Sequence, residues 1–368
     1  MNGYDHFEGN PMLLFREISR LRFGVSIFVL LFTSAIVVFF ILTWYFVLLA
    51  RNDSWRHYVG GGIYQCNAGS MSPCGEYLVF GSPKSGRGDV WRLHPKDSIL
   101  HQITDSDDFE SHPLYSPDGE SIFYLREHGG YQHVWMTDKD GKNHEQLTFG
   151  EMYDRLRDMS PCGDLLIIFR ASYRGGLGMI VGPEMIYSVS GREIVEKNMR
   201  ENIGMPMWFL DNNTLLFQSS DADTQFGKYD MRSREHTILG HGQIQAVSPN
   251  KKFICIARGG GFLNRELFLF DVENQIWKKL GTGSYPSFKG DSKIFFVQSS
   301  PRRASVYSLE DGTTNEIELP GAIVWSPVTT PDGSGILLRL IEANNGDRSG
   351  SIYIFRNNEF KKLYPFDP

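Results

Sequence analysis

Apolar and polar residues alternate in short runs between Pro113 and Thr148, and two turn signals separate these runs. The turns are Ser116–Gly119 (SPDG) and Asp138–Gly141 (DKDG). Proline presets the backbone for a turn, aspartate bonds to its own backbone, and glycine accepts a positive φ. The runs Ile122–Leu125 and Val134–Met136 have the β-branched and aromatic content of strands. The pattern predicts a four-stranded antiparallel meander of about 40 residues.

This unit recurs along the chain, and the recurrence decides the predicted fold. Equivalent turns carry Cys74, Asp118 and Cys162 at intervals of 44 residues. A single meander cannot bury both faces, so copies are expected to stack radially and cover one another. We predict an all-β fold, a seven-bladed β-propeller over Ile63–Tyr364, with six blades plus a degenerate one as the alternative. The recurring strand pairs are Tyr77–Phe80 with Asp89–Leu93, Leu165–Phe169 with Met185–Val189, Leu215–Gln218 with Lys228–Met231, Phe253–Ala257 with Leu267–Asp271, Ile294–Gln298 with Val306–Leu309, and Ile336–Leu340 with Ser351–Phe355.

Several further strands are expected at the outer edges of these units: Gln102–Thr104, Thr237–Leu239, Trp277–Leu280, Glu316–Leu319 and Lys361–Tyr364. The sequence leaves two alternatives for how the ring closes. Either residues 58–66 supply a strand beside Lys361–Tyr364, or the first and last blades only pack against each other.

Length and composition agree with a large β domain. The chain has 368 residues, 38 glycines, 13% aromatic residues and a formal net charge of −6. These values suit a turn-rich all-β protein. The mild negative charge argues against nucleic acid as a partner, because a phosphate-binding surface needs a basic patch.

A membrane segment is predicted near the N-terminus. Phe23–Leu49 has no charged residue and is long enough to cross a hydrocarbon core of about 30 Å. A cleaved signal peptide is the alternative, but the apolar run is too long and no small-x-small cleavage site follows it. Three arginines precede the span (Arg16, Arg20, Arg22), and two follow it (Arg51, Arg56). This bias favours a single-pass type II arrangement, with the propeller outside the cytoplasm.

The expected organisation is a short cytoplasmic tail (1–22), a transmembrane helix (23–49), a linker (50–62), the propeller (63–364) and a C-terminal tail (365–368). Two glycosylation sequons agree with an extracytoplasmic propeller, at Asn52 close to the bilayer and at Asn212 in a predicted exposed turn. The sequons can be glycosylated only if the source is eukaryotic. In that case the propeller is expected at the cell surface or in the lumen of the secretory pathway, and in a bacterium it is expected in the periplasm.

The four cysteines show no metal-binding spacing. Cys255 lies in the middle of a predicted strand and is expected to be buried. Cys74 and Cys162 occupy equivalent turns two blades apart, too far from each other to pair. A disulfide between Cys66 and Cys74 stays open as an alternative to free thiols.

The repeat of a hydrophobic residue, Ser-Pro-Asp-Gly, a strand, and a closing Leu-Thr resembles the TolB-like (PD40, WD40-like) propeller family. The best copies are Ser116–Gly119 with Gln146–Thr148, and Thr330–Gly333. The resemblance implies structural repeats whose turns do no chemistry. A short tail, one span and a propeller also resemble the front half of the dipeptidyl peptidase IV group. Those enzymes add an α/β-hydrolase domain, but this sequence has no Gly-x-Ser-x-Gly motif.

Two polar loops are expected to lead into inner strands at one mouth of the propeller channel. The first, Asp105–Glu110, contains Asp108 and Glu110 and is followed by His112. The second, Phe149–Asp158, is FGEMYDRLRD, and its candidate binding residues are Tyr153, Asp154, Arg155 and Arg157. Arginine beside tyrosine makes a good recognition anchor. The alternative is local pairing of arginines with carboxylates that only holds the loops.

A metal-assisted reaction is the second hypothesis for this region. Some PD40-like propellers, the oligogalacturonate lyases, bind a metal through histidines near the channel, and the resemblance raises the same question for His112. Imidazole and carboxylates can hold a divalent ion. The other histidines are scattered, however, and show no repeated ligand spacing. No cofactor, catalytic residue or metal ligand is therefore assigned.

The sequence as a whole favours a membrane-anchored, non-enzymatic binding or scaffold module that recognises a protein or glycan outside the cytoplasm. A propeller enzyme, a sugar lyase or hydrolase with its site at the channel mouth, is the alternative. A third hypothesis, an accessory subunit that assembles through its span, has less support because Phe23–Leu49 lacks a GxxxG motif.

Overall fold

The structure is a computed structural model of the chain. It describes residues 69–82, 85, 88–173, 179–199, 203–219, 224–259, 265–298, 303–323, 327–330, 332–341 and 351–365. All of them belong to one compact unit, Gln65–Pro368. The predicted span Phe23–Leu49, the tail before it and the linker with Asn52 lie outside the described residues. No helix within the described part of the chain is long and apolar enough to cross a membrane.

The described residues form antiparallel meanders that succeed one another along the chain. The first sheet contains β1 (Ser70–Met71), β2 (Leu78–Ser82), β3 (Asp89–His94) and β4 (Ile99–Gln102). The next meanders are β5 (Phe109–Tyr115), β6 (Ser121–His128), β7 (Tyr131–Asp138) and β8 (Glu145–Gln146), then β9 (Tyr153–Met159), β10 (Leu165–Tyr173), β11 (Met179–Ser188) and β12 (Glu193–Lys197). One parallel pair, Gln132 with Tyr153, joins these two meanders into an eight-stranded sheet.

The second half of the unit continues the pattern. It begins with β13 (Met205–Phe209), β14 (Thr214–Gln218), β15 (Gln225–Asp230) and β16 (Glu235–His241). A seven-stranded sheet follows, with β17 (Gln243–Val247), β18 (Phe253–Arg258), β19 (Arg265–Asp271), β20 (Trp277–Lys289), β21 (Lys293–Val297), β22 (Arg303–Ser308) and β23 (Thr314–Glu318). The long β20 is the last strand of one meander and the first of the next. The last sheet has β24 (Ala322–Ile323), β25 (Val328–Thr329), β26 (Gly335–Ile341), β27 (Ser351–Arg356) and β28 (Glu359–Pro365).

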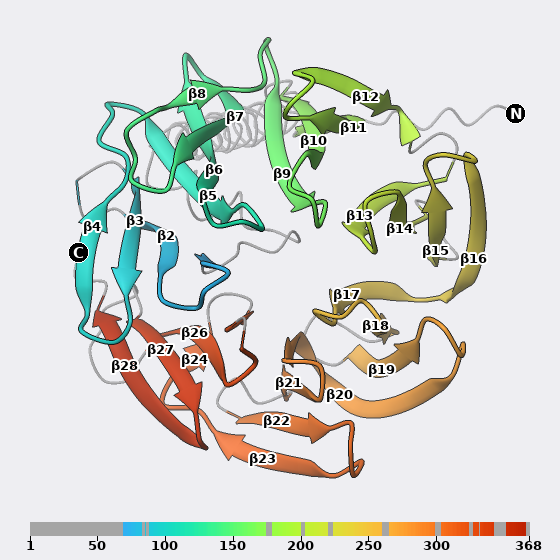
Figure 1. The fold of residues 1–368 in the computed structure, drawn as a ribbon. Coiled ribbons are helices and arrows are strands. Elements are labelled where there is room, and N and C mark those ends of the chain that lie inside the picture. Colours follow the sequence, from blue (N-terminus) through green and yellow to red (C-terminus); the bar gives the residue numbers. More distant parts are fainter. Residues whose placement is uncertain are drawn as a thin grey trace, which may run out of the picture. The chain divides into compact units, whose positions relative to one another are not determined.

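The sheets of this unit follow one another in chain order around a common centre, with β4, β12, β16, β23 and β28 at the periphery (Figure 1). Buried apolar clusters lie between neighbouring sheets, as where Val79 and Val90 meet Ile122 and Tyr124. The first and last sheets share such a cluster too, which includes Leu78 with Leu337. Among the described residues, no N-terminal strand joins the last sheet. Residues 58–66 lie outside the described residues, so a strand from this segment beside the last sheet stays a prediction.

The turn between the first two strands of a meander follows one hydrogen-bonding scheme. Ser116 Oγ accepts a hydrogen bond from the backbone N–H of Ser121 (2.9 Å), and the Gly119 N–H donates to the Ser116 carbonyl (2.9 Å). Asp118 accepts from the Ser116 hydroxyl. The equivalent hydroxyls that accept a backbone N–H belong to Ser72, Ser160, Ser248 and Thr330. The predicted turns are present, and a serine or threonine hydroxyl at their first position, to which the sequence analysis assigned no role, binds the backbone in each.

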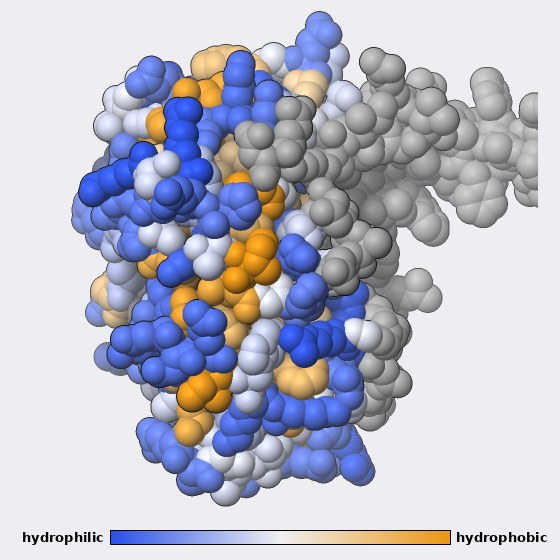
Figure 2. Space-filling view, turned by 90° about the vertical axis from the view of Figure 1, so that its right-hand side faces the viewer, coloured by the Kyte–Doolittle hydropathy of each residue, from blue (hydrophilic) through white to orange (hydrophobic). Residues whose placement is uncertain are grey.

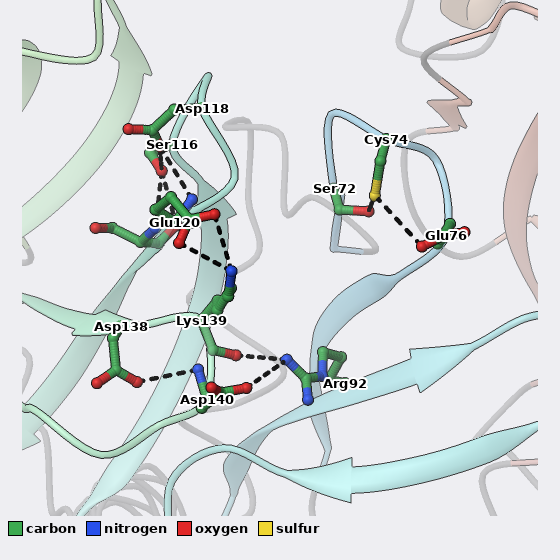
Figure 3. Close-up of polar contacts among 11 residues, drawn as sticks. Ser72, Cys74, Glu76, Arg92, Ser116, Asp118, Glu120, Asp138, Lys139 and Asp140 are labelled. Carbon is green, nitrogen blue, oxygen red and sulfur yellow. Dashed lines mark hydrogen bonds and ion pairs between the residues drawn. The ribbon is translucent and has the colours of Figure 1, made fainter.

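Figure 3 shows two of these turns and polar contacts that lie near them. Cys74 stands where the second turn has Asp118, and its Sγ lies 3.2 Å from the Ser72 hydroxyl. Arg92 of the first sheet donates to the Lys139 carbonyl (2.6 Å) and lies 3.5 Å from the Asp140 carboxylate (Figure 3). The side chain of Lys139 pairs in turn with Glu120 (2.9 Å). These contacts connect the first and second meanders at their turn end.

The outer surface is mainly polar, with hydrophobic residues exposed between the polar ones (Figure 2). Large exposed apolar residues of the outermost strands include Ile194 and Val195 on β12 and Ile238 on β16. A bulge leaves Val195 without a partner in the ladder between β11 and β12. Bulges of this kind are common on edge strands, where they hinder pairing with a second chain.

The described cysteines occupy the predicted environments. Cys74 and Cys162 are exposed, Cys255 is fully buried, and these three form no disulfide with one another. Burial raises the pKa of the Cys255 thiol. Cys66 lies outside the described residues, so its pairing stays a prediction.

Candidate binding site on the inner strands

The first strand of a meander carries the predicted site residues. Asp108 immediately precedes β5, which contains Glu110 and His112, and β9 contains Tyr153, Asp154, Arg155 and Arg157. The prediction of a loop over Phe149–Asp158 was therefore wrong for residues 153–158, and Glu110 belongs to a strand as well. Charged residues in a sequence usually indicate a loop. In these strands, side chains of neighbouring strands bind the charged groups through hydrogen bonds and ion pairs.

A bulge interrupts each of these inner strands near its middle. In β5, the register shifts between Ser111 and Leu114, so His112 and Pro113 leave the ladder. The other residues that the register skips are Arg157 in β9, Met207 in β13, Gln245 in β17, and Tyr285 with Pro286 in β20. A bulge bends the strand and redirects one side chain. The side chains of these bulge residues therefore do not follow the regular alternation of the strand.

Asp108 contacts two basic side chains of β6, Arg126 and His128. Its carboxylate accepts a hydrogen bond from Arg126 Nε (2.8 Å) and lies 3.0 Å from His128 Nδ1. Burial alone raises the pKa of Asp108, but the hydrogen bonds from His128 and Arg126 outweigh burial and leave the pKa below its ordinary value. Arg126 also lies over the Trp135 ring, with 4.7 Å between the guanidinium and the ring centroid. Asp108 thus already has structural partners.

Glu110 lies in the interface between the first two meanders and is 1% exposed. It accepts hydrogen bonds from the hydroxyls of Thr104 (3.3 Å) and Ser106, and Arg126 Nε lies 3.6 Å away. Burial, followed by the neighbouring carboxyl of Asp89, raises the pKa of Glu110 to about 7. Glu110 therefore belongs to a packed polar group between two sheets.

Asp154 is the equivalent residue of the next meander and is fully buried. It accepts two hydrogen bonds from Arg170, at 2.7 and 2.9 Å, and lies 3.2 Å from His133 Nδ1 on the preceding meander. Side chains from three strands, β7, β9 and β10, therefore meet here. The ion pair with Arg170 lies within one meander, and the contact with His133 connects it to the preceding meander.

His112 differs from these carboxylates because its side chain is exposed. Its φ is 53°, an uncommon conformation for a residue other than glycine, and Nδ1 lies 2.8 Å from the Ser111 hydroxyl. The protein atoms that surround its ring, and then the charge of Arg155, lower the pKa of His112. Solvent that reaches the ring limits the size of this shift. The imidazole is therefore neutral at pH 7 and keeps a lone pair for a ligand.

The remaining candidates make contacts on either side of β9. The Tyr153 hydroxyl donates to the Gly130 carbonyl, and the Tyr153 and Tyr131 rings are 6.2 Å apart. Arg157 lies over the Trp208 ring of β13, with 4.8 Å from the guanidinium to the centroid. Tyr153 and Arg157 thus contact different neighbouring strands, and the structure does not gather all seven candidates around one point.

Metal binding and glycosylation concern two further predictions. Within the described ranges, no group of three or more His, Cys, Asp or Glu side chains is placed to hold a metal ion. Asn212 lies exposed in its turn, as expected, and its side-chain oxygen accepts a hydrogen bond from the Cys162 N–H (2.9 Å). Glycosylation at Asn212 stays a prediction.

Sequence reasoning missed the partners of the predicted carboxylates, Arg126, Arg170, His133 and Asp89. A signal for them existed. Arg170 follows Arg126 by 44 residues, the interval that also separates Asp154 from Glu110. A search for polar residues repeated at the turn spacing would have found both pairs.

Comparison with known proteins supports the fold. No protein-family model matches the chain, and neither does any curated protein sequence. Among solved structures, an oligogalacturonate lyase in complex with manganese is similar, with TM-score 0.60, 12% identity, and coverage of 82% of this chain and 89% of that one. The β-propeller domain of the Trilobed protease from Pyrococcus furiosus, described as having an open velcro topology, gives TM-score 0.58, 12% identity, and coverage of 83% and 96%. The C-terminal WD40 domain of Sif2 gives TM-score 0.52 and 14% identity, with coverage of 80% of this chain and 82% of that one.

At these identities the similarity extends to the fold alone. It supports the predicted β-propeller. The similar structures include both enzymes and binding domains, so the fold by itself does not select a function.

Proposed function

We propose that this chain is a seven-bladed β-propeller, anchored by a single span over residues 23–49, that recognises a protein or glycan outside the cytoplasm without catalysing a reaction. The ligand binds at the inner strands β5, β9 and β13. The succession of four-stranded meanders, with packing between the first and the last, supports the number of blades.

The observation that carries the binding role is a separation between two kinds of inner-strand residue. Glu110 and Asp154 are buried and contact the preceding meander, through Thr104 and His133 respectively. His112 is exposed and Arg157 is half-buried, and both lie at bulges. A neutral imidazole and an arginine stacked on Trp208 suit recognition of a polar or acidic ligand.

The binding role is tested with the full chain in detergent on a glycan array, and for protein ligands with a photo-crosslinking amino acid at position 112. We expect Arg155→Ala to weaken a signal that the matched control Arg232→Ala, in an exposed turn, leaves unchanged. Equal signals from both variants, or a crosslinker that captures no more at position 112 than at position 232, would refute binding at the inner strands.

Orientation is tested separately through the sequon at Asn212. Thr214→Ala removes the sequon and keeps the Asn212 side chain, which holds the neighbouring turn. In a eukaryotic host with the propeller in the secretory pathway, the wild type loses more apparent mass than this variant on treatment with an N-glycosidase, because only the sequon at Asn52 is left in the variant. A cytoplasmic propeller would make both insensitive to the enzyme.

A metal-assisted lyase or hydrolase is the second candidate, and His112 is the observation that favours it. Its exposed, neutral imidazole is the form that binds metals. This candidate predicts that Mn²⁺ raises the melting temperature of the wild type and leaves that of His112→Ala unchanged. Equal melting temperatures with and without Mn²⁺ would exclude it.

A further inference from the structure

Charged side chains of the inner strand β9 are divided by sign between the two faces of its sheet. Asp154 is in register with Arg170 and lies against His133 of the preceding meander. Arg155 is in register with Phe169, which belongs to the apolar cluster shared with the following meander. Residues directly opposite each other in a ladder point to the same face of a sheet. The carboxylate therefore faces the preceding meander, and Arg155 faces the following one.

Arg157 faces the following meander as well. Its guanidinium lies over the Trp208 ring of β13, 4.8 Å from the centroid, and its Nη2 atom lies 3.5 Å from the Met207 sulfur. A guanidinium that is stacked on a tryptophan is held in place, while the N–H groups along its edge still point outward as donors. Two arginines of β9 thus lie on the side of the strand that faces β13.

The carboxylates of the inner strands β5 and β9 have protein partners instead. Glu110 and Asp154 are 1% and 0% exposed, and Asp158 accepts a hydrogen bond from the Phe209 N–H at 2.8 Å. Exposed carboxylates nearby, such as Asp105, belong to the loops that precede these strands. The accessible charge on β5, β9 and β13 is therefore mainly positive, although the chain as a whole has a formal net charge of −6.

We infer that the proposed site recognises a peptide segment with acidic side chains, whose carboxylates bind Arg155 and Arg157. This inference rests on the proposed binding role and narrows it to one class of ligand. A guanidinium offers a carboxylate two parallel N–H donors, and a charged pair of this kind is among the stronger hydrogen-bonded contacts in proteins.

The aromatic residue of this site favours a peptide over a glycan. Arg157 covers one face of the Trp208 ring, and the ring also packs against an apolar cluster. Trp208 therefore offers no open ring on which a sugar can stack. Arginine, tryptophan and methionine, the residues that meet here, are enriched at protein interfaces.

The test selects a display library of random dodecapeptides on the full chain in detergent. Enriched sequences should contain more aspartate and glutamate than the unselected library, and their affinity should fall as salt is raised, because salt screens exposed charges. The net negative charge of the chain repels acidic peptides from the rest of its surface, so this enrichment indicates a local basic site.

Variants locate the site. Arg155→Gln and Arg157→Gln should each weaken binding of a selected peptide about tenfold or more, as expected for the loss of a charged hydrogen-bond donor. Arg157→Lys keeps the charge without the paired donors, and its affinity should lie between those of the wild type and Arg157→Gln. The matched control Arg232→Gln, in an exposed turn, should bind as the wild type does.

A change in the peptide provides a second readout if an arginine variant folds poorly. Replacing the acidic residues of the selected peptide by their amides should weaken its binding to the wild type about tenfold or more for each carboxylate that contacts an arginine. The same replacement should have a smaller effect on binding to Arg157→Gln, because one partner of the pair is already absent.

Selected peptides without an acidic excess, or acidic peptides that bind the wild type and both glutamine variants equally, would overturn the inference. A library that yields no binder, while the glycan array yields one, would also overturn it. In each of these cases the proposed binding role stands. Failure of that role has a different signature, which is no ligand from the library, the array or the crosslinker at position 112.

Discussion

Replacing Asp154 by asparagine separates a structural role for this carboxylate from a role in binding. Asp154 is fully buried and accepts hydrogen bonds of 2.7 and 2.9 Å from Arg170, whose side chain is 18% exposed. The amide keeps the shape of the side chain but removes its charge, so the guanidinium loses its counter-ion. Removing one partner of a buried ion pair costs about 3–5 kcal/mol.

The assay is urea unfolding of the full chain in detergent, followed by tryptophan fluorescence. With an m value of about 3 kcal/mol/M, the midpoint for Asp154→Asn should fall by about 1 to 1.7 M. The matched control is Glu120→Gln. Its ion pair with Lys139 is mostly exposed, at 64% and 47%, and its loss should cost about 0–1 kcal/mol.

A second variant sharpens the interpretation. Arg170→Met in the Asp154→Asn background removes the unpaired cation, so the double variant should be more stable than the sum of the two single losses predicts. If Asp154→Asn costs no more than Glu120→Gln, the reasoning is refuted. The carboxylate would then be available for a ligand, as the sequence first suggested.

The remaining predictions concern a close approach, a strained residue and a buried thiol. Gly141→Ala should destabilise by about 2 kcal/mol or more in the same unfolding assay, because its φ is +71° and a Cβ would lie 2.3 Å from the Ile103 carbonyl oxygen. His112→Gly should leave stability unchanged or raise it by up to about 1 kcal/mol, since glycine accepts a φ of 53° without strain; a clear loss would assign His112 a structural role. Iodoacetamide at pH 8 should modify the two exposed cysteines and spare Cys255 until the protein unfolds, as mass spectrometry of peptides would detect, because burial raises the pKa of this thiol.

The second and third strands of each meander were predictable from the sequence. Predicted and observed bounds differ by a few residues, as for Leu215–Gln218 and the observed Thr214–Gln218. These strands are buried on both faces, so β-branched and aromatic residues fill them almost continuously. Outer strands were harder to place. The first was expected at Gln102–Thr104 but is Ile99–Gln102, because Thr104 instead supplies the hydroxyl that binds the Val90 N–H.

The inner strands were partly hidden because tertiary contacts determine them. Tyr153–Met159 has two adjacent pairs of charged residues, at 154–155 and 157–158, and lacks the alternation of a half-buried strand. The partners that neutralise Asp154 come from positions 133 and 170, too distant for a local pattern to reveal. Likewise, no sequence signal indicates that β20 continues from one meander into the next.

Two residues of the inner strand β5, Glu110 and His112, lie in different environments, and this difference limits the role that each can have. Glu110 is held between two sheets, where a ligand cannot reach it without opening the interface. His112 is two residues further along but leaves the ladder at the bulge, so it is exposed while the strand keeps its pairing on both sides. A substitution at Glu110 therefore affects stability first and the position of His112 second, whereas one at the exposed His112 is the more direct test of the proposed recognition. The same bulge recurs on the other inner strands, but there Arg157 lies over Trp208 and Tyr285 packs against a buried apolar cluster, so substitutions at these positions are expected to change packing as well as any recognition.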